Sequence, residues 1–174
     1  MINYDLKKIK ALIFDVDGVL SRETISMFPS GEPMRTVNIK DGYALQLAVK
    51  AGFHVAIITG ARTEAVKVRY NGLGIKDVYT GASIKKDCLE ELMLMYELAP
   101  EDILYMGDDI PDLECMRVVG IPVCPADAAM EVIEASRYVS EYDGGRGAVR
   151  DIIEQVLRVK GIWALDSKGV ISDK

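Results

Sequence analysis

Two carboxylates, Asp15 and Asp17, stand one residue apart directly after an apolar run, in the segment LIFDVDG (residues 12–18). An apolar run of this kind, rich in branched residues, predicts a buried strand whose carboxyl end carries both acids. Ligands of open α/β sheets bind just outside such strand ends. Unpaired charges there are costly, and a bound hard cation such as Mg²⁺ removes that cost. The pair therefore predicts a metal site.

Further polar residues follow the other predicted strands: Thr59 with Gly60, then Lys85, and later Asp108, Asp109 and Asp112. Because the carboxyl ends of parallel strands meet at one edge of a sheet, we expect these residues to converge on the first pair. Carboxylates that hold Mg²⁺, together with a lysine and a hydroxyl that bind phosphate oxygens, suit phosphoryl transfer. Lys86 is the adjacent alternative to Lys85.

Strands and helices alternate along the chain. Strands are expected at 11–14, 53–58, 77–79, 103–106 and 121–124. Helices are expected from an N-cap at Asp41, from an N-cap at Thr63, over 85–98, over 113–119, from near Asp127 and over 149–157. This order predicts an α/β protein, a Rossmann-like three-layer sandwich with a central parallel sheet.

Two segments stand outside this alternation. Residues 19–39 predict a small β-hairpin insert in place of a cap domain, because extended runs flank a Pro-Ser-Gly-Glu turn. Its apolar side chains favour burial between subunits. A Gly-rich tail and a helix occupy about 143–160. Trp163 and the residues after it are expected to be a docked or frayed terminus.

Size and charge narrow the class of protein. The 174 residues favour a single domain over 1–174. A net charge of −6 argues against nucleic-acid and anionic membrane partners. There is no apolar stretch of the roughly 20 residues that span a membrane and no signal-peptide pattern. The three cysteines have no metal-ligand spacing, so we expect reduced thiols in a cytoplasmic protein.

The segments DVDGV (15–19), ITG (58–60), Lys85 and GDDIPD (107–112) resemble, in order and spacing, the four motifs of the haloacid dehalogenase superfamily. The resemblance implies that Asp15 attacks phosphorus and forms an aspartyl-phosphate. It implies that Asp17 protonates the leaving alcohol and then activates water. The resemblance implies three further roles. Mg²⁺ would be bound by Asp15, the Asp17 carbonyl and Asp108, and phosphate by Asp15, Thr59, Gly60 and Lys85. Asp109 and Asp112 would support the metal or Lys85.

Within that superfamily, the size, the hairpin, the segments GLGI (72–75) and YTG (79–81), and the tail GGRGAVR (144–150) resemble the 3-deoxy-D-manno-octulosonate 8-phosphate phosphatases. The resemblance implies Mg²⁺-dependent hydrolysis of that sugar acid phosphate in lipopolysaccharide sugar synthesis. It also implies a homotetramer whose active sites lie near subunit interfaces. The arginines implied for substrate binding are Arg62, Arg69 and Arg146.

Alternatives remain open. A related group acting on a nine-carbon keto-deoxy sugar acid 9-phosphate has a glutamate and a lysine where this chain has Ala61 and Gly72, which disfavours that substrate. A phospho-acceptor signalling domain also combines acids, a threonine and a lysine, but its acids are adjacent after the first strand. A non-catalytic oligomerisation module related to nucleotide-sugar synthetases would be expected to lose Asp17 or Lys85, and both are present.

Overall fold

Strand β1 (Ala11–Phe14) lies at the centre of a six-stranded sheet in the computed structural model, which describes residues 1–163. The strands are all parallel, in the order β5-β4-β1-β6-β7-β8. The others are β4 (His54–Ile58), β5 (Asp77–Tyr79), β6 (Ile103–Met106), β7 (Ile121–Cys124) and β8 (Tyr138–Val139). Numbered along the chain, this order is 3-2-1-4-5-6, the order of Rossmann folds.

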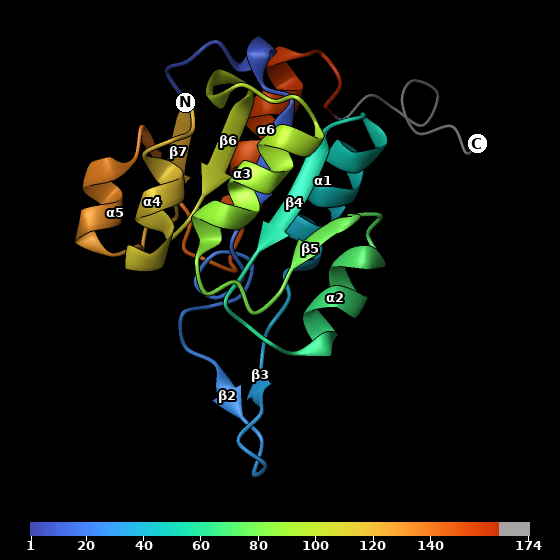
Figure 1. Ribbon diagram of the computed structural model, residues 1–174, viewed down its shortest axis with the longest axis vertical. Coiled ribbons are helices and arrows are strands. Elements are labelled where there is room, and N and C mark those ends of the chain that lie inside the picture. The colour runs from blue at the N-terminus through green and yellow to red at the C-terminus, as the bar shows by residue number, and fades with distance from the viewer. Residues whose placement is uncertain (164–174) are drawn as a thin grey trace.

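Helices cover both faces of the sheet, which confirms the three-layer prediction (Figure 1). The face with α1 (Ile39–Lys50) and α6 (Ala148–Val159) also receives apolar side chains of α2 (Glu64–Asn71). The opposite face carries α3 (Lys85–Met95), α4 (Leu113–Met116) and α5 (Met130–Ala135). Within residues 1–163, three 3₁₀ turns complete the helical elements: Leu6–Lys8, Pro100–Asp102 and Ile110–Asp112. Side chains alternate along β1, so Leu12 and Phe14 join the first core and Ile13 the second.

The predicted hairpin forms from two short strands, β2 (Ser26–Met27) and β3 (Pro33–Met34), paired antiparallel. It projects from the end of the molecule toward which the sheet strands point, while the N-terminus lies at the other end (Figure 1). Its apolar side chains are exposed, Met27 at 70%. Near its tip, the hydroxyl of Thr63 donates to Glu32 Oε1 at 3.3 Å, which ties the hairpin to the start of α2.

Four predicted helix boundaries are wrong. Helix α4, expected over 113–119, ends at Met116. Helix α1 begins after Asn38, whose side chain accepts the N–H groups of residues 40 and 41, and Asp41 lies buried in the first turn. Helix α3 ends at Met95 because Glu97 adopts a left-handed φ of 52°. Helix α5 begins at Met130, since Asp127 instead accepts the N–H of Gly144 at 2.8 Å.

Strand β8 was not anticipated from the sequence, because two half-buried residues give no alternating pattern. Trp163 is docked as expected, with the Arg150 guanidinium 5.0 Å above its ring. The rest of that expected terminus, residues 164–174, lies outside the described residues. Among the helices of residues 1–163, none combines the length and apolar character that a membrane crossing requires.

Candidate active site

Asp15 is held rigidly at the carboxyl end of β1. Its N–H donates to the carbonyl of Met106 on the neighbouring strand at 3.1 Å, and its Oδ1 accepts the N–H of Val16 at 2.6 Å. Its other oxygen, Oδ2, lies 2.7 Å from Lys85 Nζ. Asp15 is only 6% exposed, and these contacts leave its carboxylate little freedom to move.

Asp108 follows β6 and lies directly against the turn at Gly18. Gly18 has a φ of 80°, which favours glycine, and a Cβ at this position would collide with the Asp108 carboxylate. The glycine of the DVDG segment therefore serves two purposes. It lets the chain turn after the two acids, and it lets the third acid approach them.

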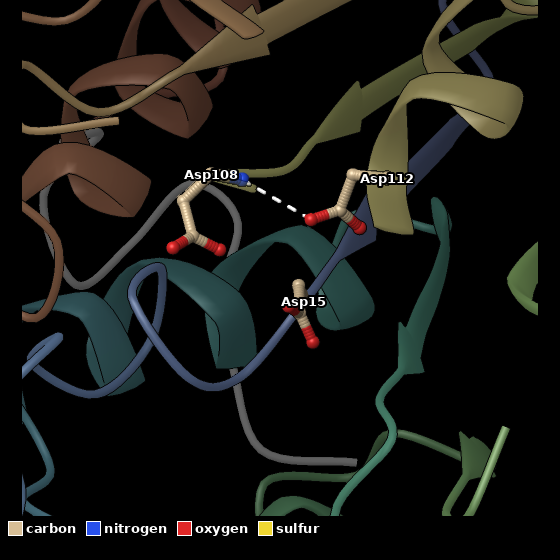
Figure 2. A group of neighbouring side chains, drawn as sticks. All are labelled: Asp15, Asp108 and Asp112. Atoms are coloured by element: carbon tan, nitrogen blue, oxygen red, sulfur yellow. Dashed lines mark hydrogen bonds between the residues drawn. The ribbon is translucent and has the colours of Figure 1, made fainter. Parts of the chain in front are cut away.

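Asp15, Asp108 and Asp112 each offer one carboxylate oxygen, and these three oxygens lie within 4.8 Å of one another. Figure 2 shows the three side chains. The N–H of Asp108 donates to Asp112 Oδ2 at 3.2 Å, which holds Asp112 against the start of the same segment after β6. Oδ1 of Asp108 is buried and has no hydrogen-bond partner among the described residues. An orphaned buried oxygen beside two further carboxylates fits a hard divalent cation, which takes oxygen ligands.

The electrostatics of this cluster also fit a cation. Burial, reinforced by the charge of Asp112, raises the pKa of Asp15 to about 6 despite the nearby Lys85. Burial and the charges of Asp15 and Asp112 raise the pKa of Asp108 to about 8. One lysine does not compensate three crowded carboxylates, so a bound metal ion would relieve their repulsion.

Lys85 begins α3 and reaches into the cluster. Its Nζ lies 2.7 Å from Asp15 and 2.8 Å from Asp112, and Asp112 also accepts the hydroxyl of Tyr105 at 2.6 Å. Burial lowers the pKa of Lys85, but the two carboxylates outweigh it and the pKa is raised. Lys86 instead faces Glu90 at 3.4 Å, with its side chain 41% exposed. The structure thus brings Lys85, and not Lys86, to the acids.

Asp17 lies apart from the three clustered carboxylates. Both of its oxygens are held by Arg35, at 2.6 Å to Nε and 2.7 Å to Nη2. Arg35 comes from the return limb of the hairpin and was not predicted as a functional residue. The only available signal was an arginine near the end of an insert, which sequence alone does not distinguish from a solvated side chain.

Thr59 and Gly60 follow β4, the strand beside β1 in the sheet. Thr59 is 2% exposed, and its hydroxyl accepts the N–H of Ala61 at 3.2 Å. Asp109 is exposed and accepts the N–H of Ile110 at 2.8 Å. These three residues lie where parallel strands were expected to place them, at the same sheet edge as Asp15.

An open cleft of about 490 Å³ covers this edge, lined by Asp15, Asp17, Lys85, Asp108, Asp109 and Asp112. None of the three arginines predicted for substrate binding lines it. Arg69 lines a separate cavity between the hairpin and α2, Arg146 lines another beside α6, and Arg62 packs on the turn at Gly81. Their proposed role stays a prediction.

The Gly-rich tail packs on the first loop of its own chain. Gly144 lies so close to the carbonyl of Gly18 that a Cβ would collide with it, and the N–H of Gly145 donates to the carbonyl of Val19 at 2.8 Å. Residues some 125 positions apart in the sequence therefore meet beside the cleft.

The strand order and a protein-family model together indicate the class of protein to which the chain belongs. Phospho-acceptor signalling domains have the flavodoxin-like sheet order 2-1-3-4-5. The order 3-2-1-4-5-6 of this sheet rules out that alternative. A protein-family model described as haloacid dehalogenase-like hydrolase matches residues 68–153.

Comparison with known proteins narrows the class. The chain is 40% identical over 155 residues to the 3-deoxy-D-manno-octulosonate 8-phosphate phosphatase of Escherichia coli K12, covering 89% of this chain and 82% of that protein. The crystal structure of the Yersinia pestis phosphatase of that name matches with a TM-score of 0.88 at 36% identity, covering 97% of this chain and 90% of that one. A Moraxella catarrhalis phosphatase, solved with magnesium, phosphate and the sugar acid KDO, matches with a TM-score of 0.84 at 32% identity, covering 88% of each chain. The chain therefore belongs to this phosphatase family of the haloacid dehalogenase-like hydrolases.

Proposed function

We propose that this protein is a Mg²⁺-dependent phosphatase that hydrolyses 3-deoxy-D-manno-octulosonate 8-phosphate to the free sugar acid and phosphate. The observation that carries the proposal is the position of Asp15. Its Oδ2 lies at the end of the central strand, 2.7 Å from a buried ammonium and among two further carboxylates. The relatives at 40% identity and the Moraxella structure with KDO support the choice of substrate.

The proposal comprises two chemical steps. Asp15 attacks phosphorus, the bond from phosphorus to the sugar oxygen breaks, and Asp17 gives its proton to that oxygen. Water then attacks the phosphorus of the aspartyl-phosphate, Asp17 takes the proton from that water, and Asp15 and inorganic phosphate are released. Lys85 stays beside Asp15 throughout and offsets the negative charge that accumulates on the phosphoryl oxygens.

The metal and phosphate would be held by residues that the sheet brings to one edge. Asp15, the backbone carbonyl of Asp17 and Asp108 are the proposed metal ligands, and Thr59, Gly60 and Lys85 the proposed phosphate contacts. Mg²⁺ bound there neutralises charge on the phosphoryl group. Asp112 supports the site through its bonds to Lys85 and to the N–H of Asp108, and Asp109 lies at its rim.

Assembly is part of the proposal. The exposed apolar side chains of the hairpin and of the start of α1 support a homotetramer with active sites near subunit interfaces: Met27, Phe28, Met34, Val37 and Ile39. We also propose that the protein is cytoplasmic, as its three free cysteines indicate. The Gly-rich tail with Arg146, and the helix residues Arg62 and Arg69, are proposed to contact the sugar acid in that assembly.

The test is phosphate release with Mg²⁺ from the eight-carbon substrate, from the nine-carbon keto-deoxy sugar acid 9-phosphate and from glucose 6-phosphate. The proposal predicts that kcat/KM is highest for the eight-carbon compound. Preference for the nine-carbon compound would move the assignment to the related group, and preference for glucose 6-phosphate would overturn the sugar acid class. Absence of turnover of all three would favour the oligomerisation module.

A further inference from the structure

The proposed acid/base, Asp17, is less constrained by its own loop than the proposed nucleophile. Asp15 is fixed by Lys85 and by two backbone hydrogen bonds, whereas Asp17 lies in the turn after β1 with its side chain 40% exposed. Within residues 1–163, the only side chain that bonds to the Asp17 carboxylate is Arg35. An acid/base group has to face the reacting oxygen, so the contact that orients it matters for the rate.

Arg35 binds both carboxylate oxygens of Asp17 in a bidentate contact. Nε lies 2.6 Å from Oδ1 and Nη2 lies 2.7 Å from Oδ2, so the planar guanidinium fixes the plane of the carboxylate as well as its position. The Arg35 side chain is only 13% exposed. This is a partly buried, directional contact, unlike an exposed ion pair between two flexible side chains.

The segment that carries Arg35 is anchored on both sides. Before it, Glu32 of the hairpin accepts the hydroxyl of Thr63 at the start of α2. After it, Asn38 caps α1 and its Nδ2 donates to the carbonyl of Gly145 at 3.3 Å. The side chain of Arg35 lines the cavity of about 200 Å³ between hairpin and α2, together with Tyr70. The backbone that carries Arg35 is thus anchored independently of Asp17.

Arg35 does not line the acidic cleft, whereas Asp17 does. Its effect on the reaction would therefore pass through Asp17. We propose that Arg35 is a positioning residue, which holds the Asp17 carboxylate toward the cleft so that it can exchange a proton with the oxygen of the leaving group. This inference rests on the proposed phosphatase function and adds the hairpin to the parts of the molecule that the reaction needs.

The test compares two leaving groups. The alkoxide of a sugar phosphate needs a proton as it leaves, whereas p-nitrophenolate leaves without one, and kcat/KM reports the phosphoryl-transfer step in both cases. For Arg35→Ala we expect kcat/KM to fall at least about 10-fold on the sugar acid phosphate, since general acid catalysis is worth about 10²–10⁴-fold. On p-nitrophenyl phosphate we expect a loss of less than about 3-fold, because that step does not use the acid.

Three companion variants sharpen the result. Arg35→Lys keeps the charge without the bidentate contact, so its kcat/KM on the sugar acid phosphate should lie between those of Arg35→Ala and the wild type. Arg22→Ala removes the same charge from the same insert, at an exposed residue with no ion pair to the rest of the described chain, and should behave as wild type. In an Asp17→Asn background, Arg35→Ala should have no further effect, because its action passes through Asp17.

The outcomes separate this inference from the function on which it rests. Equal losses on both substrates, no loss, or a gain in activity for Arg35→Ala would overturn the positioning role while leaving the phosphatase assignment intact. A further loss in the Asp17→Asn background would also overturn it, because Arg35 would then act directly. If the wild-type protein hydrolyses neither substrate, the proposed function fails first and this inference fails with it.

Discussion

Replacement of Lys85 by methionine should destabilise the protein strongly. Methionine keeps most of the side-chain volume but removes the ammonium that lies 2.7 Å from Asp15 and 2.8 Å from Asp112. The Lys85 and Asp112 side chains are 7% and 0% exposed, so water cannot replace the lost charge. Removing one partner of a buried ion pair typically costs about 3–5 kcal/mol. For a chain of this length that lowers the melting temperature by about 6–20 °C.

The measurement is thermal unfolding followed by circular dichroism, near neutral pH, in EDTA and again with Mg²⁺. Mg²⁺ should recover part of the stability of Lys85→Met, because a cation at the three carboxylates supplies some of the missing positive charge. The matched control is Lys86→Met, whose exposed ion pair with Glu90 is worth about 0.3–0.5 kcal/mol. If Lys85→Met melts at the temperature of Lys86→Met, the electrostatic account of the site is refuted.

Three further predictions concern the turn, the helix interface and the hairpin. Gly18→Ala should abolish Mg²⁺ binding in calorimetric titrations, because the new Cβ would collide with Asp108 at a φ of 80°; wild-type affinity would refute this. Burial raises the pKa of Asp41 from 3.8 to about 6. As pH rises, Asp41 therefore ionises in the unfolded chain before it ionises in the folded one. Between about pH 4 and about pH 7, the free energy of unfolding of the wild type, relative to that of Asp41→Asn, should fall by up to about 3 kcal/mol in urea titrations. A constant difference between the two proteins would count against this prediction. Met27→Asp, at a side chain 70% exposed on the hairpin, should convert a tetramer to smaller species in light scattering, and a wild-type monomer would contradict the proposed assembly.

Much of the site could be predicted because each residue follows a strand. Asp15 and Asp108 end neighbouring parallel strands, and this alone brings them together whatever the details of packing. Lys85 was expected to reach the acids from the start of its helix, and it does. The side-chain partners of these groups were less predictable, since the role of Asp112 in bonding both Lys85 and Tyr105 depends on the geometry of a 3₁₀ turn.

The roles of residues that depend on long-range packing could not be predicted from the sequence. Arg35 reaches Asp17 only because the hairpin returns across the first loop, a path that no local pattern encodes. Asn38 and Asp41 are both good capping residues, so propensity could not choose between them. Asn38 caps α1 because Asp41 is engaged elsewhere: its Oδ1 accepts the N–H of Arg150 at 2.8 Å, at the start of α6.

The role of Asp15 is the central claim, and one measurement tests it most directly. Wild type, Asp15→Asn and Asp15→Ala would be compared for phosphate release from 3-deoxy-D-manno-octulosonate 8-phosphate, with Mg²⁺ and with EDTA, after circular dichroism has shown that all three are folded. The account predicts turnover by the wild type with Mg²⁺ alone, and none by either variant. Turnover by a folded Asp15 variant at a rate near that of the wild type would contradict it.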